Sequence, residues 1–143
     1  MHDDPFNLNR FLVAQENSNY ENALDEISSG RKMGHWIWYI FPQMSGLGSS
    51  EQSRYYGIDS LAEARAYFEH PILGGRLVEI TETLTEHKST PLQDIVGNVD
   101  KMKVRSCMTL FRVASGNAVF DRAIEIFFDD IPCSVTLEML KAG

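Results

Sequence analysis

The stretch PILGGRLVEITETLTEH, residues 71–87, decides the fold class. Within it Leu73, Leu77, Ile80 and Leu84 recur every three or four residues, and glutamates occupy the opposite side of the same helical projection. Apolar residues at this spacing are typical of an amphipathic α-helix that buries one stripe and exposes the other. The stretch therefore predicts a helix packed against a hydrophobic core.

The start of this stripe carries unusual residues. Gly74 and Gly75 are adjacent, and a glycine in a helix interior costs about 1 kcal/mol relative to alanine. The pair therefore indicates either close packing against a neighbour or a late helix start. His70 precedes Pro71, which breaks the preceding helical pattern, so we expect the histidine to have a role at a helix end.

Helix boundary signals continue on the N-terminal side. Ser18 with Glu21, and Ser60 with Glu63, have the spacing of capping boxes, in which side chains satisfy the free backbone donors of a first turn. Gly30 lies where a left-handed residue would end the helix that begins near Ser18. These signals predict one helix ending before residue 30 and another beginning after residue 60.

Similar signals follow on the C-terminal side. A short helix is expected between Thr90 and Gly97, and an apolar stripe runs over residues 104–111. Asn117 precedes another apolar stripe as a capping residue, and Ser134 opens a last turn or two. Sustained alternation with a period of two is almost absent. The chain is therefore predicted to be all-α, a compact single-domain bundle of about seven to nine helices over residues 1–143.

Composition sets limits on partners. The chain has 143 residues and a formal net charge of −7, which disfavours nucleic acid because binding to phosphates depends on Lys and Arg. Cys107 and Cys133 are the only cysteines, and we interpret them as small buried hydrophobes instead of a disulfide. The histidines are scattered and no metal-ligand spacing is present, so no metal and no cofactor are expected.

The sequence also bears on location. The longest apolar run, residues 36–41, is far shorter than the roughly 18 residues of a membrane span. The first residues, MHDDPFNLNR, lack the basic start and apolar stretch of a signal peptide. We therefore expect a cytoplasmic protein with no membrane partner, and composition does not determine its oligomeric state.

The segment GRKMGHWIWYIFPQMSGLGSS, residues 30–50, departs from the pattern. It places basic and protonatable side chains directly before a cluster of aromatic residues. As a helix, His35, Trp38 and Tyr39 would share one face, whereas a strand would align the odd-numbered residues instead. We favour the helix because the flanking elements are helical. A short element that is apolar on most sides must be nearly buried.

Two interpretations of this segment remain open. Aromatic residues at this density are usually core, and a buried histidine is usually just hydrogen-bonded. Alternatively, aromatic walls with a few convergent polar groups are typical of ligand pockets. Arginine offers a planar fork to a carboxylate or phosphate, and an indole offers a stacking face.

The glycines that follow admit the same two interpretations. Gly46 and Gly48 precede Ser49 and Ser50, either of which can cap a helix whose free N–H groups would attract an anion. The spacing is neither a dinucleotide fingerprint nor a phosphate-binding P-loop. The alternative is a tight turn without a ligand.

A second candidate segment is VDKMKVRSCMTLF, residues 99–111. Lys103, Ser106 and Thr109 would be able to contact an anion near a helix start, with Asp100 as an orienting group or base. The alternative is that Asp100 simply complements the helix dipole and that the hydroxyls lie at the surface.

The blocks GRKMGHWIWYIFPQMSGLG, YYGI, HPILGGRLVE and SCMTLF resemble a bacterial family of domains of unknown function, number 1810. The resemblance runs from about Phe6 to Leu140 and implies a compact all-helical fold. The label "calpastatin-like" sometimes attached to this family would imply a disordered, proline-rich inhibitor, whereas this chain has a core. The recurring blocks include polar residues that packing alone does not require, which favours a pocket without naming its ligand.

These observations lead to one main hypothesis. We expect a small-molecule site that either binds or transforms its ligand. The expected ligand is an anionic, phosphorylated or nucleotide-like metabolite. His35 is the candidate for proton transfer, because histidine titrates near neutral pH. The residues expected to bind the ligand are Arg31, Lys32, Trp36, Trp38, Gln43, Gly46, Gly48, Tyr56, Lys103, Ser106 and Thr109. The alternative hypothesis is a non-catalytic helical module for protein interaction, anchored by Tyr55 and Tyr56.

Overall fold

The computed structural model describes residues 3–142; Met1, His2 and Gly143, the ends of the predicted 1–143 domain, lie outside the described residues. Within that range the chain forms ten α-helices. Their bounds are α1 Asn9–Ala14, α2 Asn19–Ser28, α3 Ile37–Ile40, α4 Glu51–Tyr55, α5 Leu61–Glu69, α6 Leu73–Thr85, α7 Leu92–Val96, α8 Asn98–Ser115, α9 Ala118–Phe128 and α10 Ser134–Ala142.

The all-α prediction is confirmed, but the expected number of seven to nine helices is too low for residues 3–142. The difference comes from very short helices: α3 has four residues, and α4 and α7 have five each. Such helices complete hardly more than one turn, so a repeat of 3.6 residues cannot be counted over them.

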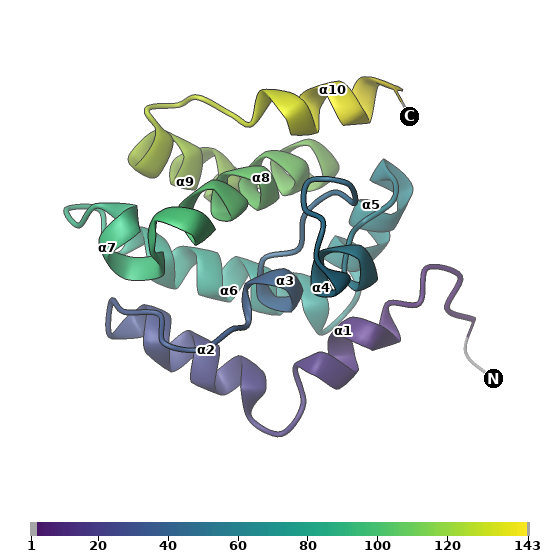
Figure 1. The fold of residues 1–143 in the computed structure, drawn as a ribbon, viewed down its shortest axis with the longest axis horizontal. Helices are drawn as coiled ribbons and strands as arrows, with labels where there is room; N and C mark the ends of the chain where they lie inside the picture. The colour runs from purple at the N-terminus through teal and green to yellow at the C-terminus, as the bar shows by residue number, and fades with distance from the viewer. Residues whose placement is uncertain (1–2, 143) are drawn as a thin grey trace.

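The helices stack around α8 (Figure 1), which contacts α5, α7, α9 and α10. Below it, α6 packs against α2, α5 and α9. Among residues 3–142 no β-strand forms. The one isolated bridge in this range joins Met44, which follows α3, to Ile58, which follows α4. None of the helices in this range has the length and apolar character that a bilayer-spanning helix needs.

Close packing explains the glycine pair in α6. A Cβ atom on Gly74 would overlap the carbonyl oxygen of Phe68, where α6 passes the end of α5, whereas a Cβ atom on Gly75 would meet nothing within 4 Å. At the start of α6, His70 Nδ1 accepts hydrogen bonds from the N–H groups of Ile72 (3.1 Å) and Leu73 (3.3 Å). Of the two alternatives for the glycine pair, close packing is therefore confirmed at Gly74, and the expected helix-end role of His70 is confirmed as well.

The other boundary signals gave mixed results. Ser60 accepts the N–H of Glu63 (3.1 Å) at the start of α5, Asn117 Oδ1 caps α9, and Gly30 is left-handed with φ of +80°. The box expected at Ser18 is wrong, because Ser18 is itself left-handed, with φ of +67°, and makes no side-chain capping bond. A left-handed backbone is not the extended conformation from which a capping side chain reaches back to its helix.

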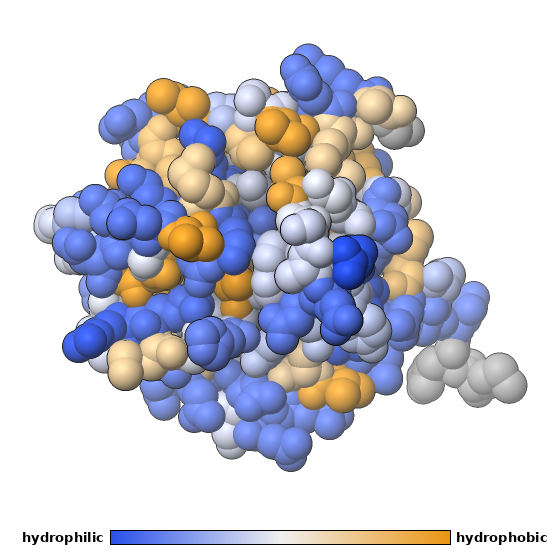
Figure 2. Space-filling view, viewed as in Figure 1, coloured by the Kyte–Doolittle hydropathy of each residue, from blue (hydrophilic) through white to orange (hydrophobic). Residues whose placement is uncertain are grey.

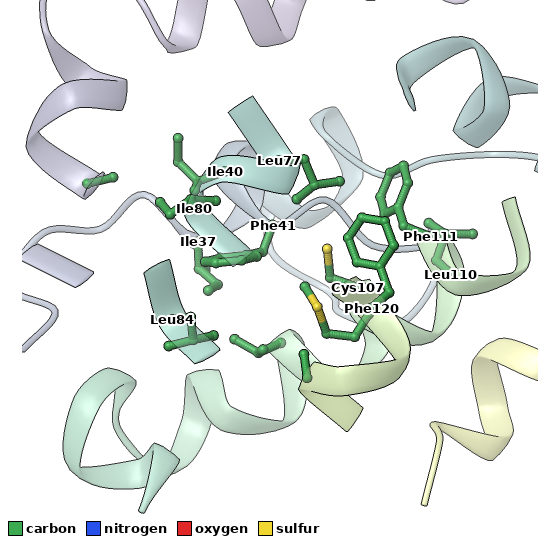
Figure 3. Close-up of a cluster of buried hydrophobic side chains, with 14 of the residues drawn as sticks. Ile37, Ile40, Phe41, Leu77, Ile80, Leu84, Cys107, Leu110, Phe111 and Phe120 are labelled. Atoms are coloured by element: carbon green, nitrogen blue, oxygen red, sulfur yellow. The ribbon is translucent and has the colours of Figure 1, made fainter. Parts of the chain in front are cut away.

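One cluster of buried side chains anchors the segment that departs from the pattern (Figure 3). Ile37, Ile40 and Phe41 point into the same apolar interior as the Leu77–Leu84 stripe of α6. Cys107 of α8 lies there too with 0% exposure, which confirms its expected role as a buried hydrophobe. Because these side chains face inward, the remaining two residues of α3 are left half-buried at the surface.

Candidate functional site

The loop that leads into α3 is held by one carboxylate. Glu26 Oε1, from α2, accepts hydrogen bonds from the N–H groups of Met33 (2.7 Å) and Gly34 (2.8 Å) and from Trp36 Nε1 (2.9 Å). Burial by itself would raise the pKa of the Glu26 carboxyl, but these three donors hold the pKa below its ordinary value. Trp36 is only 3% exposed, and its indole N–H is satisfied. The first tryptophan is therefore a core residue.

Two lysines share a second carboxylate. Lys32 Nζ lies 2.9 Å from Asp100 Oδ2, and Lys103 Nζ lies 3.0 Å from Asp100 Oδ1. Burial would raise the pKa of Asp100, yet the hydrogen bonds from both ammonium groups lower it. At neutral pH the carboxylate is therefore ionised, and the Lys32–Asp100–Lys103 cluster carries a formal charge of +1.

Each lysine of this cluster also lies near an indole ring. Lys32 Nζ is 5.0 Å from the ring centroid of Trp36, and Lys103 Nζ is 4.7 Å from that of Trp38. Both distances fall within the range of about 6 Å at which a cation is attracted to a ring face. The cluster thus links α8 to both tryptophans of the 30–50 segment.

A surface hollow of about 610 Å³ opens beside the second tryptophan. Its volume lies in the range of roughly 300–1,000 Å³ that is usual for small-molecule sites. We call it the Trp38 hollow; it is lined by Trp38, Gln43, Leu47, Gly48, Ser49, Ser50, Glu51, Gln52 and Lys103. One aromatic face and side chains of both charges thus line the same hollow.

Gln43 is the most unusual residue of this lining. Its side chain is nearly buried, with 3% exposure, and its amide nitrogen Nε2 has no hydrogen-bond partner among residues 3–142. The backbone around it is fixed, because Gln43 O accepts the N–H of Ile58 and Ser45 N–H donates to Ile58 O, both at 2.8 Å. An unpaired buried donor costs about 1–3 kcal/mol. Three other buried side-chain atoms also lack a partner among residues 3–142, on Thr81, Arg105 and Thr136, but of the four residues Gln43 is the one that lines the hollow.

The glycine-rich turn shapes the wall of the hollow. A Cβ atom on Gly48 would lie 2.9 Å from the Cβ atom of Ser53 and 3.0 Å from the ring of Trp38, so any side chain there would displace the indole. Gly46 is left-handed, with φ of +95°. Ser50 caps α4 by accepting the N–H of Ser53 at 3.1 Å, so one of the free donors expected to attract an anion is already used.

Several predicted residues lie outside the hollow. His35 and Arg31 are exposed and do not line it, and Trp36 faces the core. Gly46 is exposed at the turn without lining the hollow. Lys32 does not line the hollow either, and its ammonium group is bound by Asp100 and by Gly34 O.

The two hydroxyls predicted on α8 have a different role. Ser106 Oγ lies 3.4 Å from Cys133 Sγ, and Thr109 Oγ1 accepts the N–H of Cys133 at 2.9 Å. Both side chains therefore hold the chain that enters α10 against α8. Of the predicted residues, the structure brings together Trp38, Gln43, Gly48 and Lys103, whereas Ser106 and Thr109 are separate from the hollow.

Tyr56, also predicted to bind the ligand, packs among aromatic rings and lines a neighbouring hollow. Five lining residues were absent from the predicted set: Ser49 and Ser50, which were considered only as helix caps, and Leu47, Glu51 and Gln52. Glu51 and Gln52 follow the Ser50 cap directly, so their position in the first turn of α4 could have predicted that they lie near the hollow. Glu26 was missed as well, because nothing in the sequence ties α2 to the indole of Trp36.

Comparison with known proteins gives a family and a fold. A family described as "Protein of unknown function (DUF1810)" matches residues 5–140. The crystal structure of the conserved hypothetical protein Rv1873 from Mycobacterium tuberculosis is similar, with 40% sequence identity and a TM-score of 0.93. The match covers 96% of this chain and 99% of that one. A comparison with curated proteins found no match.

Proposed function

The chain belongs to the family of proteins of unknown function DUF1810, and we propose that its Trp38 hollow binds a small planar molecule that carries one negative charge. The observation that carries this proposal is the unpaired amide nitrogen of Gln43. Because Gln43 Nε2 is itself buried, the side chain would turn toward the hollow, where a ligand oxygen or ring nitrogen would supply the missing acceptor. The unpaired donor costs stability only in the free protein and contributes to affinity once the ligand is present.

The indole and the lysine define the rest of the ligand. Trp38 is half-buried, and Lys103 Nζ lies over its ring at 4.7 Å from the centroid, so a planar group would stack on the indole surface that the lysine leaves open. The side chain of Lys103 is 24% exposed, against 9% for Lys32, so it is the cation of the cluster that an entering anion would meet. Stacking and charge then act on one molecule.

The surrounding charges limit the ligand's own charge. Asp100 already forms an ion pair with Lys103, and the negatively charged Glu51 lines the same hollow. Together they offset much of the positive potential, so a polyphosphate would be repelled more than it is attracted. A planar carboxylate, with a single charge beside Lys103, matches the lining better.

The proposal concerns binding. His35 remains a prediction for proton transfer, but its side chain is exposed and outside the lining of the hollow. A general acid or base must come within hydrogen-bond reach of the proton that it transfers, directly or through one water. The geometry therefore supports a binding protein better than an enzyme that uses His35.

The experiment is a thermal-shift panel of planar carboxylates, nucleotides and sugar phosphates, followed by calorimetry on the strongest compound. A ligand at 100 times its Kd should stabilise the protein by about 2.7 kcal/mol. Trp38→Ala and Lys103→Met should abolish the shift. His35→Ala and Arg31→Ala, which change exposed residues of the same segment, should keep it. A shift that survives in Trp38→Ala and Lys103→Met would refute the proposed site.

A further inference from the structure

A second hollow adjoins the Trp38 hollow at α4. Its volume is about 590 Å³, and we call it the Tyr55 hollow; it is lined by Glu51, Gln52, Arg54, Tyr55 and Tyr56. Glu51 and Gln52 line both hollows, so the two share a boundary. The surface over α4 is pale to blue instead of orange (Figure 2), which indicates a polar or weakly polar face. Such a face suits a polar small molecule better than an apolar partner surface.

The Tyr55 hollow repeats the chemistry of its neighbour. Tyr55 is 57% exposed, and its ring stands edge-on to Tyr56 with 4.8 Å between centroids. Arg10 Nε donates to Tyr55 O at 2.8 Å and so fixes the backbone below the ring. Arg54 lines the same hollow as a basic side chain, and its guanidinium donates to Ser49 O. Each hollow thus combines one accessible aromatic ring with one basic side chain.

From this repetition we infer that the two hollows form one extended site, whose ligand has two aromatic rings, an amide linker and one carboxylate, the chemistry of a short aromatic peptide. The inference rests on the proposed function of the Trp38 hollow, because one ring and the carboxylate occupy that hollow. The second ring lies against Tyr55.

The shared boundary determines the linker. Glu51 places a carboxylate where the linker crosses, so the linker must donate hydrogen bonds and must not itself be an anion. An amide meets both conditions, because its N–H donates to Glu51 and its carbonyl accepts from the side-chain amide of Gln52. A pyrophosphate linker places negative charge against Glu51 and is disfavoured.

The shared boundary also determines the spacing of the rings. Glu51 and Gln52 line both hollows, so the hollows are adjacent. Alternate residues of an extended peptide are about 7 Å apart along the chain, and their side chains point to the same face. Two aromatic residues separated by one small residue therefore suit two adjacent hollows.

Calorimetry with three probes tests the inference. N-acetyl-tryptophan has one ring and a carboxylate, N-acetyl-Trp-Gly-Trp adds an amide linker and a second ring, and NAD+ joins two ring systems through a pyrophosphate. We expect the peptide to bind at least 10-fold more tightly than N-acetyl-tryptophan, and NAD+ to bind more weakly than the peptide. Glu51→Gln, which removes the charge at the boundary, should narrow the difference between the peptide and NAD+.

Variants of the two rings separate the hollows. Tyr55→Ala should remove the additional affinity of the peptide over N-acetyl-tryptophan, while the affinity for N-acetyl-tryptophan itself stays unchanged. Tyr55→Phe, which keeps the ring, should retain that additional affinity. Trp38→Ala should abolish the binding of both probes. Thermal unfolding of each variant checks that the fold is intact.

Three outcomes would overturn the inference. Equal affinity for the one-ring and two-ring probes would confine the ligand to the Trp38 hollow and leave the proposed function standing. Tighter binding of NAD+ than of the peptide would refute the amide class. Absence of binding by both tryptophan probes would remove the extended site, and together with a thermal-shift panel that finds no ligand it would remove the proposed function too.

Discussion

Two tryptophans that stand two residues apart have opposite surroundings. Trp36 is 3% exposed, and Glu26 satisfies its indole N–H at 2.9 Å. Trp38 is half-buried, lines an open hollow and lies under an ammonium group at 4.7 Å. The side chains around Trp36 are packed and hydrogen-bonded, whereas those around Trp38 include the unpaired amide of Gln43. The two tryptophans therefore differ in burial and in their polar neighbours, although they are the same residue type two positions apart.

The two lysines show the same contrast. Lys32 donates to Asp100 and to Gly34 O, and its side chain is 9% exposed. Lys103 also pairs with Asp100, but its side chain is 24% exposed and reaches the hollow. One carboxylate thus serves a buried cation and an accessible one. Lys32 is therefore the more buried of the two cations, and Lys103 is the one that lines the hollow.

The largest expected effect comes from truncating the tryptophans one at a time. Trp36→Ala should lower the free energy of unfolding by about 3–5 kcal/mol, as is usual for a fully buried aromatic side chain. Trp38→Ala should lower it by about 1 kcal/mol and should abolish ligand binding instead. Urea denaturation measures both values. Equal losses would show that the two rings are equally structural and would break the comparison.

The two adjacent glycines of α6, Gly74 and Gly75, allow a second comparison that needs no ligand. Gly74→Ala should cost about 3 kcal/mol, because the new methyl group overlaps the carbonyl oxygen of Phe68 and forces α5 and α6 apart. Gly75→Ala should stabilise the protein by up to about 1 kcal/mol, because its Cβ atom meets nothing within 4 Å and alanine favours the helix. Thermal unfolding of the two variants provides the measurement. Similar effects would contradict the packing of α6 against α5.

Removing the charge of Glu26 tests whether this carboxylate stabilises the loop that contains Trp36. Glu26→Gln should lower stability by about 1–3 kcal/mol at neutral pH, because the carboxylate accepts three hydrogen bonds. The pKa of Glu26 is lower in the folded state, so its contribution is complete above the unfolded pKa and is lost as pH falls through the folded value.

The difference between wild type and Glu26→Gln should therefore be constant near neutral pH and should shrink below about pH 4. Denaturation at a series of pH values checks this, with the exposed Glu16→Gln as control. A difference that does not depend on pH would mean that the carboxylate charge is not what holds the loop.

The long helices were predictable because the spacing of their apolar residues can be read from a single continuous segment of sequence. The Leu73–Leu84 spacing predicted α6, and the glycine pair within it signalled the contact with α5. The four-residue α3 and the five-residue α4 have too few turns to be counted from periodicity. Ser18 also misled, since a capping pattern does not reveal that its own backbone is left-handed.

The candidate site was only partly predictable, for a related physical reason. The sequence indicated the right segments, and Trp38, Gln43, Gly48 and Lys103 do meet. Whether an aromatic residue in that segment faces the core depends on partners from distant helices. A carboxylate of α2 accepts the indole N–H of Trp36, and the hydroxyls of Ser106 and Thr109 on α8 bind Cys133, just before α10. Local spacing carries no information on such contacts.

The most direct test of the account is the free energy of unfolding of Gln43→Met, measured in urea with and without the strongest compound of the thermal-shift panel. Methionine keeps a similar volume but removes the unpaired donor. The account predicts that the free variant is as stable as wild type or about 1 kcal/mol more stable, and that it gains little from the ligand. A variant that is about 2 kcal/mol less stable, and is still stabilised by the ligand, would contradict the account, because Gln43 would then be a structural residue.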